Sequence, residues 1–255
     1  MVEKNSILAF GCSFTWGEGL YYYSNLPNLP LREYHEYNGD EMTDDMLEFK
    51  NNHRYLNLVA TDLGIPYKYA FDKGNGGSTI GSFLSHHYEL FKTDYSTVKY
   101  IIWQTTAPER EWSAHPVLTG YSEDTYYFMN DPEYDEYHNM EVTRQLVFMH
   151  KRIKEFEKMG CEIIIFNWYN EYVKNEYYQK HFKKYHLPLI FDGNSYDAFE
   201  DVLCDESLRN KYTISGDFRH RNLQKNDTHF NLKGQRVLAD NIISRINELS
   251  TKNII

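Results

Sequence analysis

A serine near the start of the chain lies in a segment that favours nucleophilic catalysis. Ser13 is in GCSFTWG (11–17), directly after a short apolar run. A serine between glycines at the end of a strand can expose its hydroxyl and direct its own N–H towards an oxyanion. The same residues would also form an ordinary tight turn in which Ser13 and Thr15 act as caps. The local pattern leaves both interpretations open.

A histidine near the other end of the chain could serve as the base. His229 lies in NDTHFNLKG (226–234), and Asp227 stands two residues before it. A histidine whose ring is oriented by a carboxylate can accept the proton of a serine hydroxyl. Asp227 can reach the ring if the segment is extended, because alternate side chains then share a side. Asp217 and His220, three residues apart, form a second pair of an acid and a histidine. No glycine and no periodic helix follow that pair, so His229 is the favoured candidate.

Two further segments follow apolar runs and carry polar groups. In GNGGST (74–79), free N–H groups at a helix start could bind an oxyanion, and a plain connection is the alternative. This segment lacks the lysine of a phosphate loop and the third glycine of a dinucleotide fingerprint. QTTAPER (104–110) ends in Arg110, which either clamps a substrate carboxylate or pairs with Glu109 or Glu111.

Composition and spacing exclude several other classes of function. Lys and Arg number 27 against 37 Asp and Glu, and the net charge of −10 disfavours binding to nucleic-acid backbones. No apolar run approaches the roughly 18 residues of a membrane span, and no signal peptide is recognisable. We therefore expect a cytoplasmic protein. The histidines lack metal-site spacing, so we expect neither metal nor cofactor.

Short apolar runs and helical patterns alternate and would position these residues. Strands are predicted at 7–10, 67–71, 98–103, 163–166 and 187–191. Apolar residues at three-to-four spacing predict helices between them, among them 56–63 and an amphipathic stripe over 142–156, and a last helix over 238–249. Continuous apolar strands separated by helices indicate a mostly parallel, five-stranded sheet covered on both faces. Ligands bind beyond the carboxyl ends of such strands, which is where the polar segments lie.

Two tyrosine-rich stretches do not fit this alternation and show no clean period. They cover about 20–52 and about 111–140. Neither could bury a core of its own, so we expect both to be long insertions beside the cleft. The chain is then a single domain over 1–255.

Taken together, these segments resemble the SGNH hydrolase superfamily, the GDSL-like serine esterases. The nucleophile block of that family is matched by Gly11, Ser13, Thr15 and Gly17. Gly77 falls at the position of the oxyanion glycine, and His229, followed by x-Asn-x-x-Gly, matches the histidine block. The resemblance implies a three-layer α/β/α, flavodoxin-like fold. It also implies ester hydrolysis through an acyl-enzyme, with Ser13 as nucleophile, His229 as base and Asp227 orienting its ring.

The chain departs from the family pattern at two places. Thr106, or Thr105, stands where the family has an asparagine, so the implied oxyanion donors are the N–H groups of Ser13 and Gly77 with Thr106. The family places its aspartate three residues before the histidine, and that residue is Asn226 here. Either Asp227 acts in a shifted register, or Ser13 and the histidine act as a dyad. The Thr-x-Pro-x-Arg ending of 106–110 is similar to the ending of this block in a phage-encoded branch of the family, and this resemblance implies a virion-associated location as the alternative to a cytoplasmic one.

We expect a serine esterase that removes short acyl groups, O-acetyl above all, from a carbohydrate. The choice of substrate rests on the family and on the tyrosine-rich insertions. Two alternatives remain open at this point. One is a non-catalytic binding or virion module with the same fold, and the other is an acyltransferase that uses the same residues.

Overall fold

The computed structural model describes residues 5–17, 19–25, 43–70, 95–106, 108, 134–218 and 228–252. Contacts divide the chain into two units, and each unit is made of separate pieces of sequence. Unit 1 consists of Met1–Cys12 and Lys68–Leu187, and unit 2 consists of Ser13–Tyr67 and Pro188–Ile255. The single domain expected over 1–255 stays a prediction.

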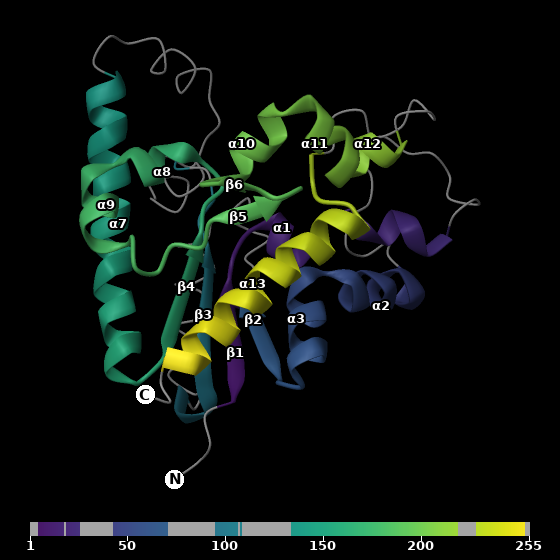
Figure 1. Ribbon diagram of the computed structural model, residues 1–255, viewed down its shortest axis with the longest axis horizontal. Coiled ribbons are helices and arrows are strands. Elements are labelled where there is room, and N and C mark those ends of the chain that lie inside the picture. Colours follow the sequence, from purple (N-terminus) through teal and green to yellow (C-terminus); the bar gives the residue numbers. More distant parts are fainter. Residues whose placement is uncertain are drawn as a thin grey trace. The chain divides into compact units, whose positions relative to one another are not determined.

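Unit 1 is built on a four-stranded sheet with the order β2-β1-β3-β4 (Figure 1). The strands are β1 (Ser6–Phe10), β2 (Tyr67–Ala70), β3 (Val98–Gln104) and β4 (Glu162–Phe166). β3 is preceded by a short 3₁₀ turn, η4 (Tyr95–Thr97). β1 pairs with β3 in parallel, and β3 pairs with β4 in parallel. The structure therefore confirms the α/β class and four of the predicted strands.

Three of the four strands are buried along almost their whole length. Nearly every residue of β1, β3 and β4 is buried, on both faces of the pleat. A strand that faced water on one side would alternate between buried and exposed residues instead. This is why the sequence shows continuous apolar runs rather than an alternating pattern.

The long helix α7 (Tyr134–Lys158) provides much of the apolar surface that covers this sheet (Figure 1). Its buried stripe, spaced by three or four residues, consists of Val142, Leu146, Met149, Ile153 and Phe156. The helix ends before Gly160, whose φ of 75° is accessible to glycine at little cost. The sequence predicted this stripe, but α7 begins inside the 111–140 stretch, which we expected to lack a regular period. Two short helices follow β4, namely α8 (Asn170–Lys174) and α9 (Glu176–His181).

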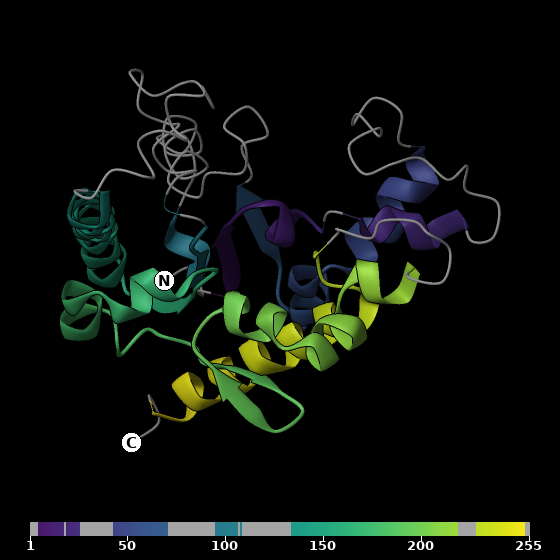
Figure 2. The same cartoon turned by 90° about the horizontal axis from the view of Figure 1, so that it is seen from above.

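Unit 2 is mainly helical, and its central element is α13 (Leu232–Lys252). α13 contacts α3 (Tyr55–Leu63), α11 (Glu206–Tyr212) and α2 (Asp44–His53). Figure 2 shows α11 beside α13. The remaining helical segments of the unit are α1 (Ser13–Trp16), η1 (Leu20–Asn25), α10 (Phe199–Cys204) and α12 (Ile214–Phe218). The helices α3 and α13 were predicted, whereas α2 lies in the 20–52 stretch and was not.

The fifth apolar run, 187–191, differs from the strand that we predicted. His186 forms one parallel bridge with Ile165 of β4, but β5 (Leu189–Phe191) pairs in antiparallel fashion with β6 (Asn194–Tyr196). The reason is the turn between them, where Asp192 and Gly193 have φ values of 49° and 81°. An Asp-Gly pair with positive φ at both positions closes a two-residue hairpin.

Among the described residues, no helix is long and apolar enough to cross a membrane. No disulfide links the three cysteines, all of which lie in the described part of the chain; Cys12 and Cys161 are buried, and Cys204 is exposed. Cys12 accepts a hydrogen bond from the side-chain amide of Gln104, at 3.0 Å.

Candidate active site

The structure brings together the two residues that the sequence suggested for catalysis. Ser13 Oγ and His229 Nε2 lie 2.8 Å apart, although 216 positions separate them in the chain. Both residues belong to unit 2. Ser13 begins α1, and His229 lies shortly before α13. With Nε2 unprotonated, the imidazole can accept the hydroxyl proton, which is the relation required between a nucleophile and its base.

An aromatic cluster holds the histidine ring. His229 is 7% exposed, and its ring centroid lies 4.5 Å from that of Phe14. Phe14 in turn contacts Phe199 and Phe230, with centroids 5.4 and 5.5 Å away. Because Phe14 directly follows Ser13, the ring that packs against His229 and the serine hydroxyl are in the same turn of helix.

Backbone hydrogen bonds fix the segment that carries the histidine. Ile214 N donates to His229 O at 2.9 Å, and Thr213 forms an antiparallel bridge with Phe230. Asn231 N donates to the carbonyl of Tyr212 at 3.0 Å. The histidine therefore lies on a short extended segment paired with the junction between α11 and α12.

Asn231 is the residue that joins this segment to α13. Its side chain is fully buried and donates to the carbonyl oxygens of Lys211 and Thr213, at 3.0 and 3.2 Å. Its Oδ1 accepts from Gly234 N at 2.9 Å, which caps the N-terminus of α13. One amide thus satisfies backbone groups of two helices.

The x-Asn-x-x-Gly pattern after His229 has a steric explanation. A Cβ on Gly234 would lie 2.5 Å from the carbonyl oxygen of Tyr212 and 2.8 Å from Phe230 Cβ. Side-chain carbons do not approach backbone oxygens so closely, so only glycine allows α13 to pack here.

The segment that carries Ser13 is anchored through its threonine. Thr15 Oγ1 and Tyr55 Oη are hydrogen bonded at 3.0 Å, and both residues are buried. Tyr55 N donates to Gln235 Oε1 of α13 at 2.9 Å, so Gln235 caps α3. Gly17, with a φ of 82°, ends α1 where a side chain would contact Arg54. The sequence identified Thr15 and Gly17 as motif residues but did not indicate Tyr55 or Gln235, because their contacts are long-range.

Several predicted site residues lie outside the described residues. They are Gly77, Arg110, His220, Asn226 and Asp227. Asp217 is described: it is exposed on α12, and its Oδ2 accepts a hydrogen bond from Tyr23 Oη at 2.6 Å. Within the described part of the chain, Asp217 is therefore bound to Tyr23 and not to His229.

Thr106 belongs to unit 1, where it follows β3 and is buried. The adjacent Thr105 donates through Oγ1 to Asn167 Oδ1 at 3.0 Å, and Asn167 donates to Tyr178 Oη at 2.7 Å. Tyr178 Oη and His186 Nδ1 are also hydrogen bonded, at 2.8 Å. This network spans the carboxyl ends of β3 and β4, and sequence reasoning missed all of it beyond the threonines.

Within the residues that the structure describes, no three His, Cys, Asp or Glu side chains gather in a way that could hold a metal ion. No protein-family model, curated protein or solved structure matches this chain. A serine hydroxyl next to an imidazole nitrogen, held by buried contacts on both sides, can transfer an acyl group through a covalent intermediate.

Proposed function

We propose that the protein is a serine hydrolase that cleaves carboxylic esters. The observation that supports this most directly is the 2.8 Å contact between Ser13 Oγ and His229 Nε2. Ser13 Oγ would form a bond to the ester carbonyl carbon while the imidazole takes its proton. The imidazole then gives that proton to the leaving alcohol as the C–O bond breaks. Water, deprotonated by the same ring, releases the acid from the acyl-enzyme.

The remaining roles in the proposal come from the sequence. Asp227 would orient the imidazole, and a Ser13–His229 dyad is the alternative. The N–H groups of Ser13 and Gly77, with Thr106, would stabilise the oxyanion, a contribution of about 3 kcal/mol per donor in related chemistry. Arg110 would contact a substrate carboxylate.

The proposed substrate is an O-acetylated carbohydrate. The resemblance to SGNH hydrolases supports this choice of substrate. It also supports two further parts of the proposal, the flavodoxin-like layering and the cytoplasmic or virion-associated location. A short acyl group also suits insertions rich in tyrosine and acidic residues. A long chain would require an apolar channel, since each buried methylene contributes about 0.8 kcal/mol.

The experiment that tests the proposal compares wild type with Ser13→Ala and a control, Ser207→Ala. Ser207 is an exposed serine of the same unit, on α11. Each protein is treated with a fluorophosphonate probe and assayed with 4-nitrophenyl acetate. We expect labelling and hydrolysis in wild type and in Ser207→Ala, and neither in Ser13→Ala.

Two results would contradict the proposal. Wild type that neither labels nor hydrolyses any short ester would indicate the non-catalytic binding module. Labelling and turnover that persist in Ser13→Ala would assign the activity to another residue. Adding a sugar acceptor separates hydrolysis from acyl transfer, because a transferase forms a new ester at the expense of free acetate.

A further inference from the structure

Unit 1 contains an open groove that is lined almost entirely by basic side chains. It lies between α7 and the segment that runs from α9 to Lys184, and its volume is about 540 Å³. Besides Gln179, the lining residues are His150, Lys154, Lys180, His181, Lys183 and Lys184. We call this feature the basic groove.

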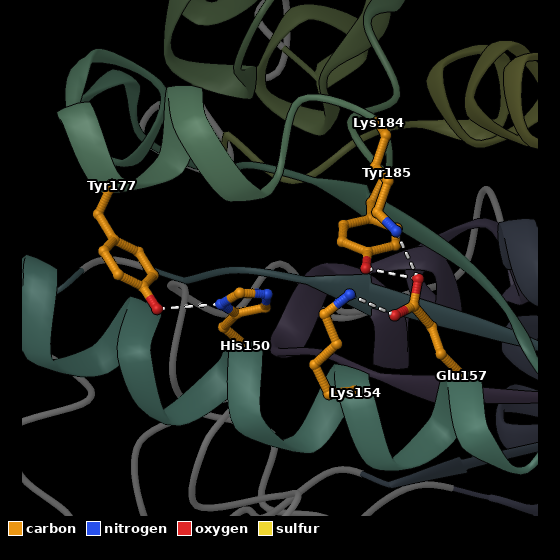
Figure 3. A network of polar contacts seen from close by, with 6 residues as sticks. All are labelled: His150, Lys154, Glu157, Tyr177, Lys184 and Tyr185. Atoms are coloured by element: carbon orange, nitrogen blue, oxygen red, sulfur yellow. Dashed lines mark hydrogen bonds and ion pairs between the residues drawn. The ribbon is translucent and has the colours of Figure 1, made fainter.

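The charge of the basic groove contrasts with that of the whole chain. The protein carries a net charge of −10, yet no acidic residue lines the groove. The adjacent Glu157 accepts hydrogen bonds from Lys154 at 2.7 Å, and from Lys184 and Tyr185 at 2.6 Å each (Figure 3). Burial alone would raise the pKa of Glu157, but these three donors outweigh it and lower the pKa to about 2.

One carboxylate does not neutralise this cluster. Glu157 forms ion pairs with two lysines, Lys154 and Lys184. Lys180 and Lys183 are exposed, and neither forms an ion pair within the described part of the chain. The groove therefore retains an excess of positive charge even before its histidines are protonated.

The two histidines of the groove are close to each other and to these lysines. The ring centroids of His150 and His181 are 4.7 Å apart, and His150 Nδ1 is hydrogen bonded to Tyr177 Oη at 2.9 Å (Figure 3). Partial burial and the positive charges of His181, Lys154 and Lys184 lower the pKa of His150, against an opposing effect of Glu157. The imidazole thus responds to the same excess of positive charge.

We propose that the basic groove binds a small ligand that carries at least two anionic groups, such as phosphates, sulfates or clustered carboxylates. Its volume falls in the range of about 300–1,000 Å³ that is usual for small-molecule sites. Lysine ammonium groups bind phosphate as point charges and need no fixed bidentate geometry, which suits long, exposed side chains. A long polyanion is disfavoured because the rest of this acidic chain would repel it. The site is independent of Ser13 and His229.

The binding test uses three probes: inorganic pyrophosphate, sucrose octasulfate and citrate. Calorimetric titrations compare wild type with the double variant Lys180→Gln/Lys183→Gln. The matched control is Lys151→Gln/Lys174→Gln, which removes the same charge from exposed positions of the same unit outside the groove. We expect the groove variant to weaken binding of the preferred probe by about tenfold, and the control by less than about twofold. The probe that binds most tightly identifies phosphate, sulfate or carboxylate as the preferred group.

A local measurement accompanies the titration. The His150 ring pKa, followed by NMR, should rise when the preferred probe is bound, because an anion offsets the surrounding positive charge. Failure of all three probes to bind saturably would overturn the proposal. Equal weakening by the two double variants, or an unchanged His150 pKa on binding, would do the same, since each would place the anion elsewhere. Thermal unfolding of both double variants verifies that they are folded.

Discussion

The Ser13–His229 pair and the basic groove place their functional groups in different ways. The pair joins positions 216 apart and depends on a buried aromatic cluster, an extended backbone segment and the Asn231 amide. The groove draws on residues close in sequence, on one face of α7 and on 179–184, and most of its side chains are exposed. Proton transfer requires one geometry within a few tenths of an ångström, whereas attraction of an anion depends mainly on charge density.

This difference predicts different responses to mutation. A change around the Ser13–His229 pair should act through geometry and affect turnover or stability sharply. A change in the groove should act through charge, and its effect should decrease with added salt.

The largest effect is expected for His229→Gln. Glutamine can accept a hydrogen bond from Ser13 but cannot take its proton, so ester turnover should fall on the order of 10³-fold or more. The single variants His229→Gln and Ser13→Ala and the double variant should lose about the same factor, because they disable one unit. Steady-state kinetics with 4-nitrophenyl acetate measures this. Additive losses of turnover in the double variant would contradict the idea that the two residues act as one unit. A change in anion binding by the groove in any of these variants would contradict the independence of the two sites.

The second-largest effect concerns Asp227, which we propose orients the ring of His229. Asp227→Asn should lower turnover about a hundredfold, because an amide stabilises the imidazolium poorly. Asn226→Ala and Asp217→Asn should lose less than about tenfold, the latter because Asp217 is bound to Tyr23. Near-wild-type turnover in Asp227→Asn would indicate a dyad instead.

A smaller effect, on stability, is expected for Gly234→Ala. Helix propensity alone favours alanine by about 1 kcal/mol, but the new Cβ would lie 2.5 Å from the carbonyl of Tyr212. We expect a net loss of about 2 kcal/mol in the free energy of unfolding, which urea denaturation measures. Lys233→Ala, at the exposed neighbouring position, is the control. Equal stability of the two variants would mean that α13 shifts without cost.

The smallest effect is the loss of stability in acid that we expect from Glu157, the carboxylate next to the basic groove. The pKa of Glu157 is lowered to about 2 in the folded protein from an ordinary value of 4.5, so its stabilisation is present above pH 4.5 and is lost as the pH falls towards 2. Glu157→Gln should remove about 1 kcal/mol of this pH dependence, allowing for solvent screening. Unfolding measured between pH 5 and pH 2 tests it, with Glu155→Gln, which alters an ion pair with Arg152, as control. Identical pH profiles for the two variants would refute this role of Glu157.

Much of the fold could be read from local patterns. The runs 98–103 and 163–166 became β3 and β4, and the stripe from Val142 to Phe156 became the buried face of α7. The hairpin of β5 and β6 could also have been predicted, because Asp192-Gly193 is a known turn signal. It was missed because the apolar run before it was interpreted as another parallel strand.

Local patterns are enough to select the candidate residues, since Ser13 and His229 lie in short segments whose glycines and polar residues are recognisable. Their meeting, and the contacts through which Tyr55, Asn231 and Gln235 hold their segments, exist only in the folded chain. The physical reason is that a contact across 216 positions depends on the summed packing of α1, α3, α11 and α13. The spacing of apolar residues within one helix does not show how several helices pack together. The groove depends on the fold less, because its residues are already close together along two short stretches of the chain.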